Sequence, residues 1–495
     1  MTDESVFPNA AYKETVLAPL FEGAKTHFVA PVRAINQAHL VMLTETGILD
    51  TAQTRSIASA LDEIDQNTDL DAHNYTGEFE DYFFFVEAEL KKRVGPDLAG
   101  ALHTARSRND MDHTVFKMIL STRLDDLLDN AHALANMLID KATREKTTLI
   151  IAYTHGQPAQ PGTFGHYLGA MAEVLLRDIA RLHQARQALE LCPMGAAAIT
   201  TSGFPIDRSR MARLLGFKGP TQNSYASIAS VDYITALYSA LKLLFIHLGR
   251  VIQDFQFWSS FEVGQLYVPD EFVQISSIMP QKRNPVPIEH LRLLSSLTVG
   301  RCDTMVNTMH NTPFTDMNDS EGEVQQAGYS AFESGNRALK LLGALVPALS
   351  IQADRVRATM EKSCITITEL ADTLVREEKL SFRQAHEIAA ATSAAVIAEE
   401  KPLYGGFEAF SNAFKAVLKR RPSLDKTAFT TAVSPENFIA VRTRYGGPAP
   451  EPMNEALTGY RTELKRFVEK AIENKKFRAD SARGLSAAFA RLKNT

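Results

Sequence analysis

The chain has 495 residues, and 53 Lys plus Arg face 58 Asp plus Glu, so the formal net charge is only −5. This balance argues against a polybasic nucleic-acid-binding protein. The cysteines Cys192, Cys302 and Cys364 are too widely spaced for a disulfide framework, which favours a reducing cytoplasm. Neither a signal peptide nor an apolar run of about 18 residues is recognisable, so we expect no membrane span.

Five long segments carry apolar residues at steps of three and four, the spacing typical of amphipathic helices. In chain order they cover residues 112–148, 164–191, 231–266, 287–312 and 328–349. Helices of this length are unusual in compact domains and predict a long helical bundle. Alternating patterns typical of strands are scarce, so the predicted fold class is mainly α.

Two stretches rich in polar and turn residues indicate domain boundaries. The first lies at 100–110 and the second at 353–366, after the last long helix. We therefore expect an N-terminal helical domain (1–110), a central long-helix bundle (111–355) and a C-terminal helical domain (356–495).

Three polar segments combine anion-binding groups with turn residues: S-R-N-D at 107–110, T-H-G-Q-P-A-Q-P at 154–161 and S-S-I-M-P-Q-K-R-N-P at 276–285. Arg108 and Lys282 can hold carboxylates. The guanidinium of Arg108 can donate two parallel hydrogen bonds, and the ammonium group of Lys282 acts as a point charge. His155 can exchange a proton near neutral pH. Taken alone, the first segment is typical of a helix cap and the second of a turn. The third, with ten residues of mixed chemistry, predicts a functional loop.

The third segment resembles the signature loop S-S-x-M-P-x-K-x-N-P of the fumarase/aspartase superfamily. Residues 103–110, H-T-A-R-S-R-N-D, resemble the H-T-G-R-S-R-N-D of its argininosuccinate lyase branch, and 153–161 resemble that branch's Y-T-H-x-Q-x-A-Q-P. The resemblance implies a mainly α, three-domain fumarase/aspartase-type fold. We expect no metal or cofactor, because the 13 histidines are scattered and neither a metal-ligand spacing nor a glycine-rich phosphate loop is evident. It also implies a homotetramer whose active sites each combine segments from three subunits.

The resemblance further implies a carbon–nitrogen lyase that reversibly eliminates an amine from an N-substituted L-aspartate and leaves fumarate. Such a site must stabilise the dianionic aci-carboxylate that forms when the proton next to a carboxylate is removed. By the family pattern Ser276 is the general base, helped by Lys282 and backbone N–H groups. His155 and its acidic partner Glu289 handle the proton on the nitrogen side, and which group is the acid stays open.

The family pattern also assigns substrate contacts. The reacting carboxylate is held by Lys282 and Asn284. The succinyl part is held by Ser107, Arg108, Asn109 and Thr154, and the remaining expected contacts are Gln157, Ser277 and Met279.

The chain departs from the branch after Cys302, where the family's Tyr, Gln and Lys are replaced by Asp316, Glu321 and Val324. A lysine that pairs with an amino-acid carboxylate is thereby lost, and two acids are gained. Acids at these positions suit a substrate with a second ammonium group, although they could instead lie on a solvated loop that touches nothing.

We therefore expect a small polycarboxylate substrate with Asp316 among its contacts, such as ethylenediamine-N,N′-disuccinate (EDDS). Argininosuccinate, cleaved to arginine and fumarate, is the alternative substrate. An inactive structural homologue, like the lens crystallins recruited from this branch, is a third possibility.

Overall fold

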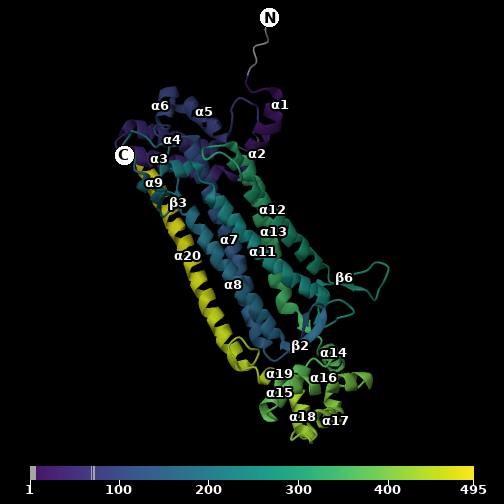
Figure 1. Ribbon diagram of the computed structural model, residues 1–495. Coiled ribbons are helices and arrows are strands. Elements are labelled where there is room, and N and C mark those ends of the chain that lie inside the picture. Colours follow the sequence, from purple (N-terminus) through teal and green to yellow (C-terminus); the bar gives the residue numbers. More distant parts are fainter. Residues whose placement is uncertain (1–6, 69, 71–72, 495) are drawn as a thin grey trace.

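A computed structural model describes residues 7–68, 70 and 73–494 of the chain. Figure 1 shows a long helical bundle with a smaller group of helices at each end. The N-terminal group lies at one end and consists of α1 (Ala10–Tyr12), a π-helical turn (Lys13–Leu17), α2 (Ala18–His27), α3 (Val29–Glu45), α4 (Thr51–Asn67), α5 (Tyr82–Val94) and α6 (Pro96–Ala101).

The bundle confirms the five long helices that the apolar spacing predicts, with ends that shift by several residues. They are α7 (Arg108–Arg144), α8 (Phe164–Leu189), α11 (Asp232–Trp258), α12 (Val286–Thr308) and α13 (Gly322–Ala348). Fully buried Leu127, Leu241 and Leu342 lie at their contacts. By length and composition α11 could cross a membrane, and in the fold it packs against α8 and α12.

Short strands that the sequence did not predict join the helices. An antiparallel hairpin, β1 (Leu149–Thr154) and β2 (Gln157–Thr163), links α7 to α8. Near the N-terminal group, β3 (Leu191–Cys192) pairs in parallel with β4 (Gly219–Pro220), and α9 (Arg208–Leu214) and α10 (Ser224–Ala229) complete the link to α11. The antiparallel pairs at the other end are β5 (Leu266–Tyr267) with β8 (Ser350–Ile351) and β6 (Gln274–Ile275) with β7 (Arg283–Asn284).

The C-terminal region divides into two parts. Four helices pack around a separate core that includes Leu370, Ile388 and Phe410. They are α15 (Ile367–Glu377), α16 (Phe382–Ala398), α17 (Phe407–Leu418) and α18 (Lys426–Ala432). Beside them, α14 (Ala353–Ser363) and α19 (Pro435–Ala440) pack against the β1–β2 hairpin. One C-terminal domain from 356 to 495 was expected, but this compact group ends before the last helix.

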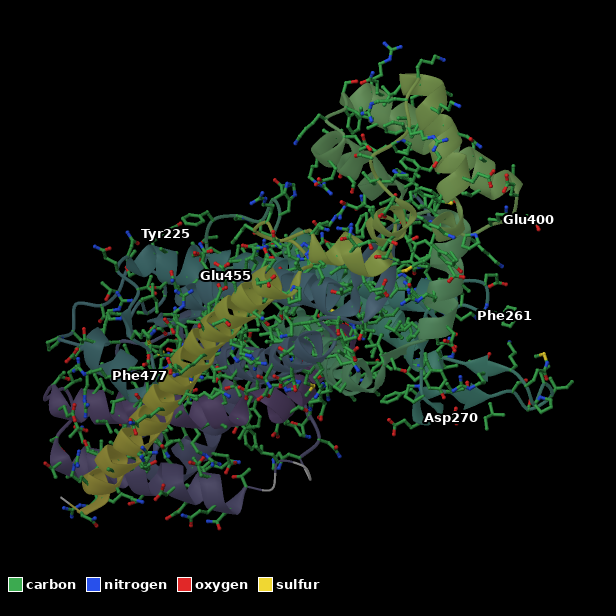
Figure 2. All side chains as sticks on the ribbon, turned by 90° about the horizontal axis from the view of Figure 1, so that it is seen from below. Tyr225, Phe261, Asp270, Glu400, Glu455 and Phe477 are labelled. Carbon is green, nitrogen blue, oxygen red and sulfur yellow. The ribbon has the colours of Figure 1, made fainter. Side chains whose placement is uncertain are left out.

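The last helix, α20 (Pro450–Asn494), has 45 residues and runs back along the bundle to the N-terminal group. Figure 2 shows Glu455 and Phe477 along its path. Its buried Met453, Phe467 and Phe489 belong to the same core as α7 and α8. A break at Gly446, Gly447 and Pro448 lets the chain reverse before α20 begins.

Candidate active site

The histidine of the second polar segment stands at the tip of the β1–β2 hairpin. Because Thr154 pairs with Gln157, the loop consists of His155 and Gly156 alone. Their φ values are 54° and 73°, and two positive φ values define the type I′ turn that suits a two-residue hairpin. The segment is therefore a turn, as its sequence indicated, and Thr154, His155 and Gln157 are all exposed. Left-handed backbone at a non-glycine residue costs energy, and such strain concentrates at functional positions.

The signature loop connects β6 to β7 and extends away from the bundle (Figure 1). At its base, Asn284 Nδ2 donates to the Gln274 carbonyl at 3.2 Å. At its start, Ser276 Oγ accepts the backbone N–H groups of Met279 at 3.1 Å and Ile278 at 3.4 Å. Two N–H dipoles aimed at one oxygen favour its negatively charged form.

The remaining residues of this loop face solvent. Ser277, Met279 and Lys282 are exposed, while Asn284 is half-buried at the end of β7. Ile275 and Ile278 are 76% and 82% exposed, which is unusual for large apolar side chains on a monomeric surface. In Figure 2 the loop projects beyond Asp270. Glu289 lies on the first turn of α12, in a groove of about 500 Å³ that it shares with Gln256 and Arg292.

The first polar segment begins α7 at the opposite end of the bundle. Ser107 caps the helix, and Asp110 completes a capping box by accepting the Ser107 N–H at 3.0 Å. The other oxygen of the buried Asp110 carboxyl accepts the N–H groups of Gly195 and Ala197, both at 2.9 Å. Asn109 Nδ2 donates to the Ala198 carbonyl at 3.2 Å. The segment is thus a helix cap, as its sequence indicated, and a fixed platform that presents Arg108.

Carboxyl groups surround Arg108. Its Nη1 contacts Asp81 Oδ2 at 2.6 Å and Glu80 Oε1 at 3.2 Å. Burial, followed by the neighbouring Asp316, raises the pKa of Glu321 to about 7. Burial also raises the pKa of Asp316, against the attraction of Arg108. These two residues are half-buried and interact with each other, so the interpretation that they lie on a solvated loop is wrong.

Within one chain, long helices separate the first polar segment from the second and the third. Helix α7 has 37 residues, so Arg108 lies about 55 Å from the hairpin end of the same helix. Helix α12 has 23 residues, which places the signature loop about 35 Å from the end where Asp316 lies. Figure 1 shows β2 and β6 at the end opposite the N-terminal group. The chain brings Ser107, Arg108, Asn109 and Asp316 together at one end and holds His155, Ser276 and Lys282 at the other.

Several polar neighbours of Arg108 were not recognised from sequence. Glu80 and Asp81 precede α5, and the acidic run that contains them carried no recognised motif. Asp112 follows the recognised segment closely and reads from sequence only as the start of a helix. Its position four residues after Arg108 is the available signal, because residues three and four apart share one helix face.

Comparisons with known proteins place these motifs in a family. A family described as lyase matches residues 22–300, and one described as argininosuccinate lyase C-terminal matches residues 364–440. The "Argininosuccinate lyase 2" of Agrobacterium fabrum is 58% identical over 492 residues, covering 99% of this chain and 98% of its own. The "Argininosuccinate lyase 1" of Shouchella clausii is 33% identical, covering 90% and 89% of the two chains.

Solved structures agree with this assignment. A variant of EDDS lyase with bound fumarate is 27% identical and has a TM-score of 0.84, with 97% of this chain and 96% of that chain covered. A class II fumarase from Schistosoma mansoni, 17% identical, shares the fold with a TM-score of 0.66 over 86% of this chain and 91% of its own. The possibility of an inactive structural homologue is thereby set aside. The chain belongs to the argininosuccinate lyase branch of the fumarase/aspartase superfamily, and it is a carbon–nitrogen lyase that releases fumarate.

Proposed function

We propose that Ser276 is the base that starts amine elimination from an N-substituted L-aspartate. The observation that carries this proposal is the pair of backbone N–H groups, from Ile278 and Met279, on Ser276 Oγ. The oxygen takes the proton from the carbon next to the distal carboxylate, which becomes a dianionic aci-carboxylate. That electron pair then forms the carbon–carbon double bond of fumarate while the carbon–nitrogen bond breaks. The nitrogen keeps the bonding pair, takes a proton and leaves as the amine.

The other predicted residues have roles that follow from their charge and position. Lys282 and Asn284, on the same loop as Ser276, hold the carboxylate on which negative charge develops. At the other end of the bundle, Arg108 with Ser107 and Asn109 holds the succinyl part. At the hairpin tip, Thr154 and Gln157 flank His155. His155, paired with Glu289, serves the proton on the nitrogen side. The buried, free cysteines fit the proposed location in the cytoplasm.

We further propose that each active site is assembled from several copies of the chain in a homotetramer. The separation of Arg108 from Ser276 along the bundle supports this, because no small substrate spans a helix of 23 residues. A surface groove of about 1020 Å³ between α8, α11 and α12 supports it as well. Apolar side chains such as Val174, Ile246 and Val299 line that groove. A second bundle would cover this face and bring its own polar segments to the loops of the first.

Replacing the proposed base and its neighbour separately tests the chemistry. Ser276→Ala is expected to abolish fumarate formation, measured by its ultraviolet absorbance. Ser277→Ala is the matched comparison, because it removes the same hydroxyl one position further along the loop. As an expected substrate contact rather than the base, it should raise KM while kcat stays within about tenfold of the wild-type value. Undiminished fumarate release by Ser276→Ala, with a normal oligomer, would remove Ser276 as the base.

For the amine half of the substrate we propose an aminopolycarboxylate such as EDDS. The half-buried carboxyl groups of Asp316 and Glu321 near Arg108 support a cationic amine half, and EDDS lyase is a near structural neighbour. Argininosuccinate is the second candidate, favoured by the name of the relative that is 58% identical.

The reverse reaction separates the two substrates. Fumarate is incubated with ethylenediamine in one sample and with arginine in another, and its loss is followed by absorbance and the adduct by proton NMR. We expect loss with ethylenediamine, while addition of arginine alone would favour argininosuccinate.

A further inference from the structure

Carboxyl groups outnumber cations around Arg108. Among the described residues, five carboxyl groups act electrostatically on this one guanidinium, those of Glu80, Asp81, Asp112, Asp316 and Glu321. Glu80 and Asp81 contact it directly. The other three, Asp112, Asp316 and Glu321, form what we call the acidic cluster. They come from the second turn of α7 and from the segment between α12 and α13, which the fold brings together.

The acidic cluster carries more negative charge than the protein neutralises. Repulsion from Asp316, after burial, raises the pKa of Glu321. Burial, followed by repulsion from Glu321 and Asp81, raises the pKa of Asp112 well above its ordinary value. Mutual repulsion among these carboxyl groups would be relieved by a cation that a ligand supplies.

A buried histidine points independently to a ligand beside this cluster. His113 is fully buried, and its Nδ1 is held by the Tyr233 hydroxyl at 3.0 Å. Its Nε2 has no hydrogen-bond partner and faces Asp316 Oδ1 at 4.0 Å, and that oxygen is also without a partner. A buried polar atom without a partner is costly. Two unpartnered buried atoms beside the acidic cluster therefore show that its hydrogen bonding is incomplete in the single chain.

Aromatic rings stand next to the same segment. Phe314, two residues before Asp316, stacks on Tyr225 with ring centroids 5.9 Å apart. Both rings are exposed, Phe314 by 67% and Tyr225 by 41%. The faces of such rings attract cations.

We propose that the acidic cluster, with His113 behind it, binds a second ammonium group on the amine half of the substrate and sets the specificity of the enzyme. The substrate class is an N-(aminoalkyl)-L-aspartate type, to which EDDS belongs. An ammonium group has three donors, enough for Asp316, Glu321 and Asp112 at once. Arg108 stays paired with Asp81 and Glu80 and keeps its positive face for the succinyl part. This inference rests on the proposed function, because it presumes that the segment around Arg108 lines the site of elimination.

The inference is tested by assaying the assembled full-length enzyme with two matched substrates. N-(2-aminoethyl)-L-aspartate and N-propyl-L-aspartate have the same shape, and only the first has the second ammonium group. The measured quantity is the ratio of kcat/KM for fumarate release from the two. We expect the wild-type ratio to favour the aminoethyl substrate by about 10- to 100-fold, the range for one charged hydrogen-bonded contact. Glu321→Gln and Asp316→Asn should each lower this ratio by about tenfold, mainly through KM.

Asp319→Asn is the matched control. It removes an exposed carboxyl group from the same segment, and the ratio should stay as in the wild type. If the acids merely hold Arg108 in place, Glu321→Gln will slow both substrates equally, and an unchanged ratio overturns the inference. A wild-type protein that releases no fumarate from either substrate would instead count against the proposed function. Because Glu321→Gln keeps the shape of the side chain, it is the variant to use if Asp316→Asn does not fold.

Discussion

Mixing two inactive variants, Arg108→Ala and Ser276→Ala, should produce an active enzyme. Each variant alone lacks one part of every site, and we expect a loss of about 100-fold or more, the range for truncating one partner of a desolvated charge contact. In one chain Arg108 begins α7 next to the N-terminal group, whereas Ser276 follows β6 at the other end of the bundle (Figure 1). A site that uses both must therefore take them from different chains, so a mixed tetramer can contain sites with both residues intact.

The fraction of the wild-type rate that should return follows from counting the intact sites in the mixed tetramers. A site is intact when the chain that supplies Ser276 is not the Ser276 variant and the chain that supplies Arg108 is not the Arg108 variant. With equal amounts and random assembly, each condition holds for half the sites, so about one quarter of the wild-type rate should return. A site within one chain would recover nothing, because every chain carries a defect.

The assay is fumarate release after the two variants are unfolded together, refolded and shown by differently tagged chains to have exchanged subunits. A mixture of Ser276→Ala with Lys282→Ala is the control. These residues share one loop, so no site can receive both intact and the rate should stay low. Absence of recovery in the Arg108 mixture after proven exchange would refute the reasoning, as would equal recovery in the control.

Three further predictions concern stability and pH. Ala105→Gly should raise the free energy of unfolding by about 0.5–1 kcal/mol in urea titration, because Ala105 has φ 59° where glycine carries no strain; a loss of stability would contradict this. Asp110→Ala should lower it by about 2–4 kcal/mol in the same titration, because the N–H groups of Gly195 and Ala197 lose their acceptor; an unchanged midpoint would show that they find other partners. The pKa of Glu321 is raised to about 7 by burial and by Asp316, and only its ionised form attracts an ammonium group. KM for the aminoethyl substrate should therefore fall as pH rises through about 7, and Glu321→Gln should flatten that profile; a wild-type KM independent of pH would exclude Glu321.

The bundle and the signature loop could be predicted from the sequence because each depends on local patterns. Apolar spacing in segments such as 164–191 is set by the helix period and needs no knowledge of neighbours. Ser276, Lys282 and Asn284 lie within nine residues, so their chemistry was visible in one stretch. The sequence also shows Ala105 where the family motif has glycine, and in the structure Ala105 has a left-handed backbone conformation.

Other features depend on contacts between distant residues and could not be read locally. Strand β2 contains Pro158 and Pro161 and lacks alternation, so nothing in its sequence indicates a strand, and a hairpin with only two strands tolerates both prolines. Asp81 and Asp316 are 235 positions apart, and only the fold brings both to Arg108. The return of α20 along the bundle likewise depends on apolar positions that match α7 and α8.

The most direct test of the account is a side-by-side measurement of kcat/KM for fumarate release from EDDS and from argininosuccinate by the same preparation of the wild-type protein. The acidic cluster beside Arg108 predicts a larger value for EDDS, with Glu321→Gln reducing it more than the value for argininosuccinate. A clear preference of the wild-type protein for argininosuccinate would contradict the account.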